Sequence, residues 1–215
     1  LCGESGSGKT TFSRLVNGLI PNYYEGTLTG KVRVEDKNPE EVELHELAPY
    51  VGSVFQNPKA QFYTLITDTE IVFACENMGM DCGEILRRFD TTVTAMHLES
   101  LIGRNLFTLS GGEKQKIACA SVHALQPDVL VVDEPTSNLD IGTIHELENI
   151  LRLWKALGKT VIVAEHRLDW LRLLADRVLY FKDGKIEQEF TGAAFFEKPL
   201  GDLHEMGLRG TDRFV

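Results

Sequence analysis

The most informative stretch of this 215-residue chain is Gly3-Glu4-Ser5-Gly6-Ser7-Gly8-Lys9-Thr10. It fits the pattern G-x-x-x-x-G-K-[ST], in which a glycine-rich loop opens a helix. Glycines let consecutive backbone N–H groups converge on phosphate oxygens, and the N-terminus of the helix adds positive potential. A chance match to so long a pattern is rare, so we expect a nucleotide to bind on this loop and on the adjacent Thr11.

Two side chains of the loop have distinct expected roles. Lys9 would reach the β- and γ-phosphates of the nucleotide, and the hydroxyl of Thr10 would bind Mg²⁺. The residues from 9 to 19 place apolar side chains on one face of a helix. The pattern is specific for a nucleotide phosphate, but it does not choose among the families of nucleotide hydrolases.

A second candidate feature is a short apolar strand that ends in two acids. Val129-Leu130-Val131-Val132 reads as a strand buried on both faces, and Asp133 and Glu134 follow it directly. Carboxylates at the carboxyl edge of a parallel sheet lie where ligands bind. Asp133 would hold Mg²⁺, and Glu134 would polarise the attacking water as a general base. By itself the pattern is also typical of a strand leaving the core, and only the loop at Gly3 favours the functional interpretation.

Strands and helices alternate along the chain, which predicts an α/β fold with a mainly parallel sheet. The predicted strands span residues 30–35, 50–55, 129–132, 160–164, 178–181 and 185–190, the last two joined by an Asp183-Gly184 turn. The predicted helices span residues 9–19, 112–125, 144–157 and 168–174. Two further helices between 67 and 98 predict a helical subdomain at about 57–110, within a single domain of residues 1–215. No clear pattern follows Gly192.

Composition limits the classes of partner. The chain is 43% hydrophobic and 25% charged, as in an ordinary globular protein, and its net charge is −10. Nucleic acid selects basic surfaces, so this charge argues against nucleic acid as a partner. No apolar run approaches the roughly 18 residues that a membrane span needs, so we expect attachment to a membrane to go through a partner protein.

The stretch Leu109-Ser110-Gly111-Gly112-Glu113 opens the helix predicted from 112 onward. Ser110 can cap this helix, the two glycines expose backbone N–H groups, and the glutamate suits the first turn. A simple capping sequence would look the same on physical grounds. Given its distance from Asp133, however, the segment 109–115 resembles the signature of ATP-binding cassette (ABC) ATPases. The resemblance implies that Ser110 to Gly112 contact the γ-phosphate of a nucleotide bound by the opposite subunit.

Three more elements of that family match this sequence. Gln56, after the strand at 50–55, resembles the glutamine that senses Mg²⁺ and water and links to a membrane subunit. The segment Ser137-Asn138-Leu139-Asp140 resembles the one that places an aspartate, here Asp140, at the dimer seam beside the nucleotide. His166, after the strand at 160–164, resembles the switch histidine near the γ-phosphate. The resemblance thus implies catalysis by Glu134, Gln56 and His166, and Mg²⁺ binding by Thr10, Gln56 and Asp133.

The residues between the motifs resemble one branch of the family, the ATPases of energy-coupling factor importers for cobalt, nickel or vitamins. The similar segments are 55–62, 69–70, 76–79, 165–169 and 183–186. The resemblance implies an ATPase that uses ATP and Mg²⁺ to power import of a small solute such as a metal ion or a vitamin. It also implies two partners, a second ABC ATPase subunit or domain (identical or homologous) and a transmembrane subunit. The expected location is the cytoplasmic face of the cell membrane.

The alternative is a non-transport ABC ATPase of the DNA-repair or translation-factor type. The DNA-repair class inserts a long coiled coil between the phosphate loop and the signature. Lys9 and Ser110 are too close for such an insertion, and no sustained heptads lie between them. Translation-factor members carry two cassettes joined by a basic linker; neither is visible, although a longer protein could contain the second. A GTPase or small-molecule kinase would share the loop but not residues 109–113.

The chain starts at Leu1, without a methionine and without the buried strand that normally precedes such a loop. We therefore expect an N-terminally truncated copy of the domain. The resemblance places the missing strand between those at 160–164 and 178–181, so a gap should separate these two strands, or they should have closed on each other. Normal pairing through a strand built from Leu1 and Cys2 would contradict this expectation. The family's adenine-stacking aromatic also lies before the loop, so no base contact is assigned.

Overall fold

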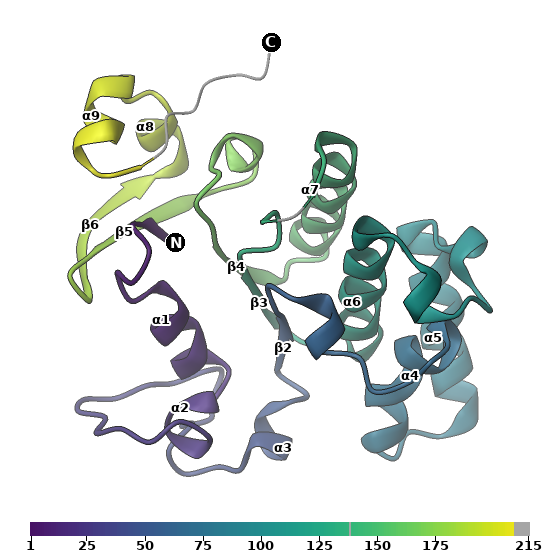
Figure 1. Ribbon diagram of the computed structural model, residues 1–215. Coiled ribbons are helices and arrows are strands. Elements are labelled where there is room, and N and C mark those ends of the chain that lie inside the picture. The colour runs from purple at the N-terminus through teal and green to yellow at the C-terminus, as the bar shows by residue number, and fades with distance from the viewer. Residues whose placement is uncertain (138, 209–215) are drawn as a thin grey trace.

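The computed structural model describes residues 1–137 and 139–208. Its centre is a parallel sheet with the order β2 (Val51–Val54), β3 (Val129–Asp133) and β4 (Thr160–Ala164). Val51 aligns with Val129, and Val129 aligns with Thr160. All three strands end at the same edge (Figure 1), and the prediction of an α/β fold with a mainly parallel sheet is confirmed.

A second sheet has the order β1 (Cys2–Gly3), β5 (Arg177–Lys182) and β6 (Lys185–Thr191). β1 runs parallel to β5, whereas β5 and β6 form an antiparallel hairpin. Asp183 and Gly184 at its turn have φ values of 49° and 76°, as a tight two-residue turn requires. The predicted hairpin is therefore present.

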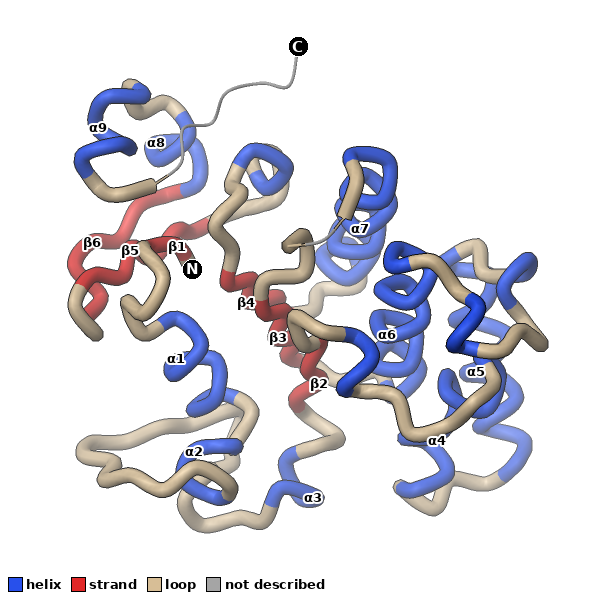
Figure 2. The backbone as a smooth tube through the Cα atoms, in the orientation of Figure 1, coloured by secondary structure: helices blue, strands red, loops and turns tan. Residues whose placement is uncertain are grey.

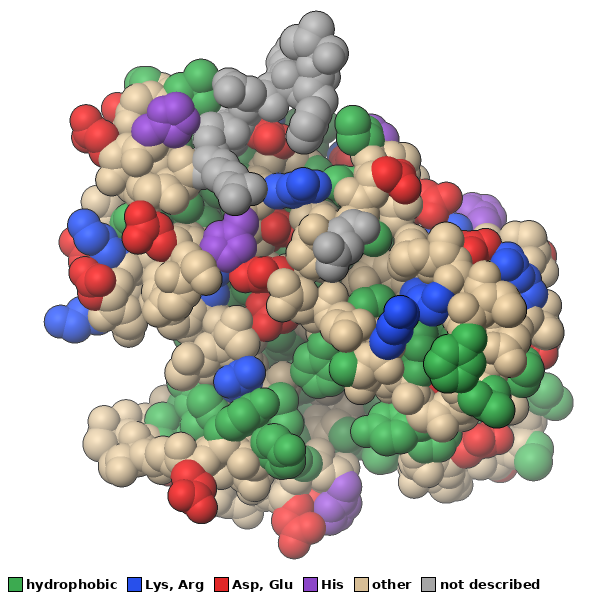
Figure 3. Space-filling view, viewed as in Figure 1, with side chains coloured by type: hydrophobic (Ala, Val, Ile, Leu, Met, Phe, Trp, Pro, Cys, Tyr) green, Lys and Arg blue, Asp and Glu red, His purple; other side chains and the backbone are tan. Residues whose placement is uncertain are grey.

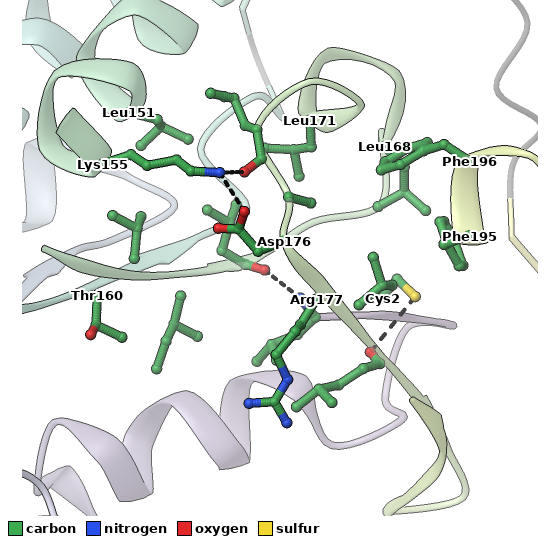
Figure 4. A pocket seen from close by; sticks show the side chains of 18 of the residues that line it. Cys2, Leu151, Lys155, Thr160, Leu168, Leu171, Asp176, Arg177, Phe195 and Phe196 are labelled. Carbon is green, nitrogen blue, oxygen red and sulfur yellow. Dashed lines mark hydrogen bonds and ion pairs between the residues drawn. The ribbon is translucent and has the colours of Figure 1, made fainter. Parts of the chain in front are cut away.

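β4 and β5 flank a gap in which, among the described residues, no strand ladder joins them. At one end Leu1 fills the gap: its N-terminal nitrogen donates to Val163 O at 2.6 Å, and its carbonyl accepts from Glu165 N at 3.1 Å. Cys2 pairs with Tyr180 of β5. The rest of the gap is a cavity of about 420 Å³ walled mainly by aliphatic and aromatic side chains (Figure 4). Leu1 and Cys2 thus pair with both strands at the end that leads into the phosphate loop, which contradicts the expectation there, whereas a cavity separates the two strands beyond that end.

Helices cover the sheets on both sides (Figure 2). α1 (Lys9–Val16) leads away from the phosphate loop, and α6 (Gly111–Leu125) and α7 (Ile141–Ala156) pack beside the central strands. α1 ends earlier than predicted because Gly18 turns left-handed, with φ 74°, where a β-carbon would lie 2.7 Å from the Leu47 side chain. The main core lies between α6, α7 and the strands, and Trp154 is its largest fully buried side chain.

The two helices predicted between residues 67 and 98 are α4 (Thr67–Asn77) and α5 (Cys82–Met96). Asp81 caps the start of α5 by accepting from the backbone N–H groups of residues 83 and 84. Both helices pack against α6, so they hold the helix that opens with the candidate signature. No helix in residues 1–137 and 139–208 combines the length and the apolar character needed to cross a bilayer.

Two sequence predictions of secondary structure were wrong, and several short elements were not predicted. Residues 30–35 form no strand; Val34 makes an isolated bridge to Lys37, because no strand in the described part of the chain pairs with this segment. The helix predicted at 168–174 is a single 3₁₀ turn, Asp169–Leu171. The short helices α2 (Leu19–Asn22), α3 (Leu44–Leu47), α8 (Gly192–Phe196) and α9 (Leu200–Glu205) and the 3₁₀ turns Pro58–Ala60, Glu99–Leu101 and Leu106–Thr108 had no prediction.

Candidate active site

The phosphate loop connects β1 to α1 and curls around the ammonium group of Lys9. Lys9 is only 4% exposed, and its Nζ donates to Gly3 O at 2.9 Å and to Glu4 O at 2.8 Å. A side chain at Gly3, which has φ 144°, would place its β-carbon 2.2 Å from Phe181 O, so glycine is required there. Burial lowers the pKa of Lys9, and nearby carboxylates, Glu134 first, act against that shift.

The β5–β6 turn supports the same loop from outside. Gly184 N donates to Ser7 O at 3.1 Å, and the backbone of Gly184 lies so close to Gly8 that a β-carbon on Gly8 would approach within 3.3 Å. Gly6, in contrast, has φ 79° and open space around it. The loop is therefore fixed on its outer side and open at Gly6.

Thr10 and Asp133, two of the three predicted metal ligands, lie side by side. The Thr10 hydroxyl donates to Asp133 Oδ1 at 3.4 Å. Burial raises the pKa of Asp133, and the hydrogen bond from Thr10 opposes the rise. The structure thus brings together an alcohol and a partly buried carboxylate, both oxygen donors.

Glu134 lies between Gln56 and His166. Gln56 Nε2 donates to Glu134 Oε2 at 3.1 Å, and His166 Nε2 lies 2.8 Å from Glu134 Oε1. The three residues meet because each one follows a strand of the parallel sheet, β2, β3 and β4 respectively, and all three strands end at one edge. The geometry places the three predicted catalytic residues in one contact group.

The backbone of Glu134 is held in an unusual conformation. Its φ is 43°, in the left-handed region that residues other than glycine rarely adopt. Its N–H donates to Ala164 O at 2.8 Å, which ties the end of β3 to the end of β4. Surrounding contacts must compensate for this conformation, and such positions are often found at functional sites.

The candidate signature forms a well-made helix start. Ser110 caps α6: its hydroxyl accepts from Glu113 N at 3.2 Å, while the Glu113 carboxylate accepts from Ser110 N at 2.7 Å. Arg104 also donates to Glu113 at 2.7 Å, and these contacts lower the pKa of Glu113, the backbone hydrogen bond most. The expected capping role of Ser110 is confirmed. Gly111 and Gly112 begin the helix, and Ser110 and Gly111 are exposed.

Among the described residues, Asp140 forms no hydrogen bond with the phosphate loop. Its carboxylate caps α7 by accepting from Thr143 N at 2.9 Å and from the Thr143 hydroxyl at 3.2 Å. The Thr143 side chain lies so close to Gly112 that a β-carbon there would approach its Oγ1 within 2.5 Å. Within residues 1–137 and 139–208, no hydrogen bond joins Ser110–Gly112 or Asp140 to the group around Glu134. Asn138, the second residue of the predicted seam segment, lies outside the described residues.

Sequence reasoning missed two buried polar residues next to this group. Glu165 is 2% exposed and Thr136 is fully buried, and the Thr136 hydroxyl donates to Glu165 Oε2 at 2.6 Å. Glu165 directly follows the apolar β4, just as Asp133 ends the apolar β3. An acid directly after a buried apolar strand is a sequence signal that could have identified Glu165.

Comparison with known proteins agrees with this geometry. The model of the ABC transporter family matches residues 1–137. A protein of Treponema denticola named as an ABC transporter ATP-binding protein is 45% identical over 209 residues, 97% of this chain and 43% of that protein. A second, from Pyrococcus abyssi, is 39% identical over 97% of this chain and 75% of that protein. The chain spans less than half the length of the Treponema denticola relatives that it matches.

A solved structure has the same fold. It is that of cbiO1 from Clostridium perfringens, described as part of the ABC transporter complex cbiONQ. The TM-score is 0.81 at 27% identity, over 94% of this chain and 81% of that one. Taken with the phosphate loop, the grouped Gln56, Glu134 and His166, and the separate signature helix, these matches show that the chain belongs to the ABC transporter family, as one of its ATP-binding domains.

Proposed function

We propose that this chain binds ATP with Mg²⁺ on the loop Gly3–Thr10 and hydrolyses it with Glu134 as general base. The observation that carries the proposal is the position of the Glu134 carboxylate, which contacts Gln56 through one oxygen and His166 through the other. A base needs an unprotonated acceptor within hydrogen-bond reach of the attacking water, and neighbours that hold its carboxylate in place. A glutamine amide and an imidazole meet that need.

The residues around Thr10 fit Mg²⁺. Thr10 Oγ1 and Asp133 Oδ1 are 3.4 Å apart, and Gln56 follows the adjacent strand, so an alcohol, a carboxylate and an amide are available. Mg²⁺ prefers oxygen ligands of this kind, together with phosphate oxygens of the nucleotide. When bound, Mg²⁺ supplies neutralisation of the charge on the β- and γ-phosphates.

Lys9 and the loop amides supply the rest of the phosphate site. The ammonium group already lies within the loop, bonded to the carbonyl oxygens of Gly3 and Glu4. The third donor of Lys9 makes only a long contact to Ser7 Oγ, at 3.5 Å, so a phosphate oxygen of ATP would take that hydrogen bond, and the N-terminus of α1 would add favourable potential. Thr11, the second residue after Lys9, is exposed at the same helix start and would also contact phosphate.

We propose that a second ABC ATPase subunit or domain completes each site. Ser110, Gly111, Gly112 and Asp140 form a group of their own around the starts of α6 and α7, without a hydrogen bond to the Glu134 group among the described residues. An exposed helix N-terminus with two glycines suits a phosphate presented by another molecule. A head-to-tail dimer, of identical or homologous cassettes, would use the signature of one to close the loop of the other.

We also propose that a transmembrane subunit docks in a groove beside Gln56. This groove, of about 460 Å³, lies between α1 and the end of β2 and is lined by the proposed metal ligands Thr10 and Asp133 as well as by aromatic side chains. The aromatic residues Tyr23, Tyr24 and Phe55 have 72%, 38% and 38% of their surfaces exposed. Figure 3 shows hydrophobic side chains on both sides of a hollow in this region. Exposed aromatic side chains around a groove are typical of a protein interface. Phe55 precedes Gln56 directly, so a partner bound in this groove would contact the chain next to the Gln56, Glu134 and His166 group.

The similarity to cbiO1 supports one kind of transporter. By analogy with a protein that is part of an ABC transporter complex, we propose that ATP hydrolysis here powers import of a small solute, such as a metal ion or a vitamin. The chain would then work on the cytoplasmic face of the cell membrane, bound to its transmembrane partner. This part of the proposal rests on family similarity.

The test is phosphate release from Mg-ATP by the intact protein carrying Glu134→Gln. The amide cannot accept the proton, so we expect the rate to fall by a factor on the order of 10² to 10⁴, with ATP binding retained. Glu197→Gln, at an exposed position outside the site, should leave the rate unchanged. An unchanged rate in Glu134→Gln would rule out Glu134 as the base.

Docking needs its own test. Tyr23→Asp places a charge in the groove, and we expect it to abolish co-purification of the transmembrane subunit. Leu173→Asp is the matched control, because Leu173 is 76% exposed and does not line the groove. Equal recovery of the membrane subunit with both variants would contradict docking at this place.

A further inference from the structure

Glu165 is a buried carboxylate whose burial the site described so far does not explain. It is 2% exposed, and among the described residues no lysine or arginine lies within ion-pair distance of it; the Lys9 ammonium acts on it only over a longer range. A buried charge is costly unless hydrogen bonds replace its water, and a neutral residue would avoid that cost. A carboxylate that is buried next to the proposed switch histidine therefore calls for a specific role.

The hydrogen bonds of Glu165 connect two loops. Oε1 accepts from the backbone N–H groups of His166, at 2.7 Å, and Arg167, at 3.0 Å. Oε2 accepts from the hydroxyl of Thr136 at 2.6 Å. One oxygen therefore fixes the loop after β4, and the other fixes the loop after β3.

We propose that Glu165 and Thr136 form a clasp that positions Glu134 and His166 relative to each other for ATP hydrolysis. The inference rests on the proposed function of Glu134 and His166, and it adds two positioning residues to it. Glu134 lies two residues before Thr136, and His166 directly follows Glu165, so both members of the 2.8 Å contact are anchored beside the clasp.

The backbone around Glu134 shows why a clasp is needed. With φ at 43°, Glu134 would relax toward an ordinary conformation unless its loop were held. Its N–H is bonded to Ala164 O, and Ser137 N donates weakly to Glu134 O at 3.4 Å. These contacts hold the backbone of Glu134 itself, whereas the Thr136–Glu165 bond ties its loop to the loop of His166 through side chains that lie outside the Glu134–His166 contact.

The clasp makes a prediction that a purely structural role does not make. Misplacing a catalytic group by about 1 Å can cost a factor on the order of 10² in rate, with little effect on substrate binding. Loss of the clasp should therefore lower kcat for ATP hydrolysis and leave KM unchanged. A residue that only stabilised the fold would lower thermal stability without this split.

Three variants of the intact protein test the clasp by phosphate release from Mg-ATP. Thr136→Val removes only the hydroxyl, and we expect kcat about tenfold lower with KM within about twofold of the wild type. Glu165→Ala should lower kcat at least as much. Glu165→Gln should recover most of the rate, because its amide oxygen still accepts from the two N–H groups and its NH₂ can donate to Thr136 Oγ1. Thr136→Val should cause no further loss in the Glu165→Ala background.

Thr92→Val is the matched control, a buried threonine of α5 outside the site, and should keep wild-type kcat. The clasp is overturned if the folded Thr136→Val, Glu165→Gln and Glu165→Ala proteins all have wild-type kcat and KM. If Glu165→Ala does not fold, wild-type kcat in the isosteric Thr136→Val variant alone overturns it. Glu134→Gln in the same assay separates the proposed base from the proposed clasp. Full activity of Glu134→Gln would refute Glu134 as the general base, while kcat of Thr136→Val would still decide the clasp.

Discussion

Glu134 Oε1 lies 2.8 Å from His166 Nε2, at the shared edge of β3 and β4. The contact follows from strand order, because parallel neighbours deliver the residues after them to the same place. Yet the side chain of Glu134 reaches His166 only through a backbone with φ at 43°. The site therefore carries conformational strain that has measurable consequences for stability.

The first prediction concerns this strain. Glycine adopts φ 43° without penalty, whereas alanine pays about 1 kcal/mol or more in this region. Both substitutions remove the same contacts to Gln56 and His166. We therefore expect Glu134→Gly to have a free energy of unfolding about 1 kcal/mol higher than Glu134→Ala, measured by urea denaturation.

An ordinary helical position gives the opposite order and serves as the control. Asp90 is exposed within α5, where glycine is about 1 kcal/mol worse than alanine. Asp90→Gly should thus be less stable than Asp90→Ala. If Glu134→Gly were also the less stable of its pair, the left-handed conformation would not be a source of strain.

The second prediction separates the two glycines of the signature. A β-carbon at Gly111 meets nothing within 4 Å, whereas one at Gly112 would lie 2.5 Å from Thr143 Oγ1 and 2.6 Å from its Cγ2. Gly111→Ala should leave the free energy of unfolding unchanged or slightly raised. Gly112→Ala should lower it by about 1–3 kcal/mol, because α6 and α7 must move apart.

A double-mutant cycle identifies the cause. Thr143→Ala removes both close atoms and should restore part of the stability lost in Gly112→Ala, although alone it costs the hydrogen bond to Asp140. Additive effects of Gly112→Ala and Thr143→Ala would show that the overlap does not limit this helix start.

Sequence patterns predicted the elements that contain strong local signals. Consecutive apolar residues identified β3 and β4, and the loop and the two acids after β3 identified the phosphate site. The meeting of Gln56, Glu134 and His166 was expected from family resemblance. Strand order explains it physically, but strand order is a tertiary property that local periodicity does not contain.

The wrong and missing sequence predictions also depend on tertiary contacts that local periodicity does not contain. Residues 30–35 alternate like a strand, but within residues 1–137 and 139–208 no strand pairs with them, and Val34 makes a single bridge to Lys37. The two helices after Gly192 are too short for a periodic signal; tertiary packing of Phe195 and Leu203, both almost fully buried, holds them. The clasp of Thr136 and Glu165 joins residues that no local pattern connects.

The third prediction concerns a buried histidine at the core of α6 and α7. Trp154 Nε1 donates to His123 Nδ1 at 3.1 Å, and burial lowers the pKa of His123. Because the unfolded chain then binds the proton more readily, stability should fall as pH drops below about 6.5. His123→Asn keeps an acceptor for Trp154 but cannot titrate in this range.

Urea unfolding followed by tryptophan fluorescence at pH 7.5 and 5.5 measures this effect. The wild type should lose more stability than His123→Asn over that interval. His204→Asn, at an exposed position of α9, is the control and should keep the wild-type pH dependence. An equal loss in wild type and His123→Asn would show that His123 does not link folding to pH.

The fourth prediction concerns Glu84, which pairs with Arg87 at 2.7 Å and Arg88 at 2.6 Å. Arg88 also donates to Leu125 O at 2.7 Å, at the end of α6. Hydrogen bonds from the two arginines lower the pKa of Glu84 to about 2, so its stabilisation is present above pH ~4.3 and is lost as pH falls toward 2. The difference in free energy of unfolding between wild type and Glu84→Gln, measured in urea, should therefore shrink over that pH range. It should also shrink in high salt, because these charges are near the surface. Glu99→Gln, at an exposed position with no ion pair among the described residues, should show no such difference, and a pH-independent effect of Glu84→Gln would contradict the ion-pair origin.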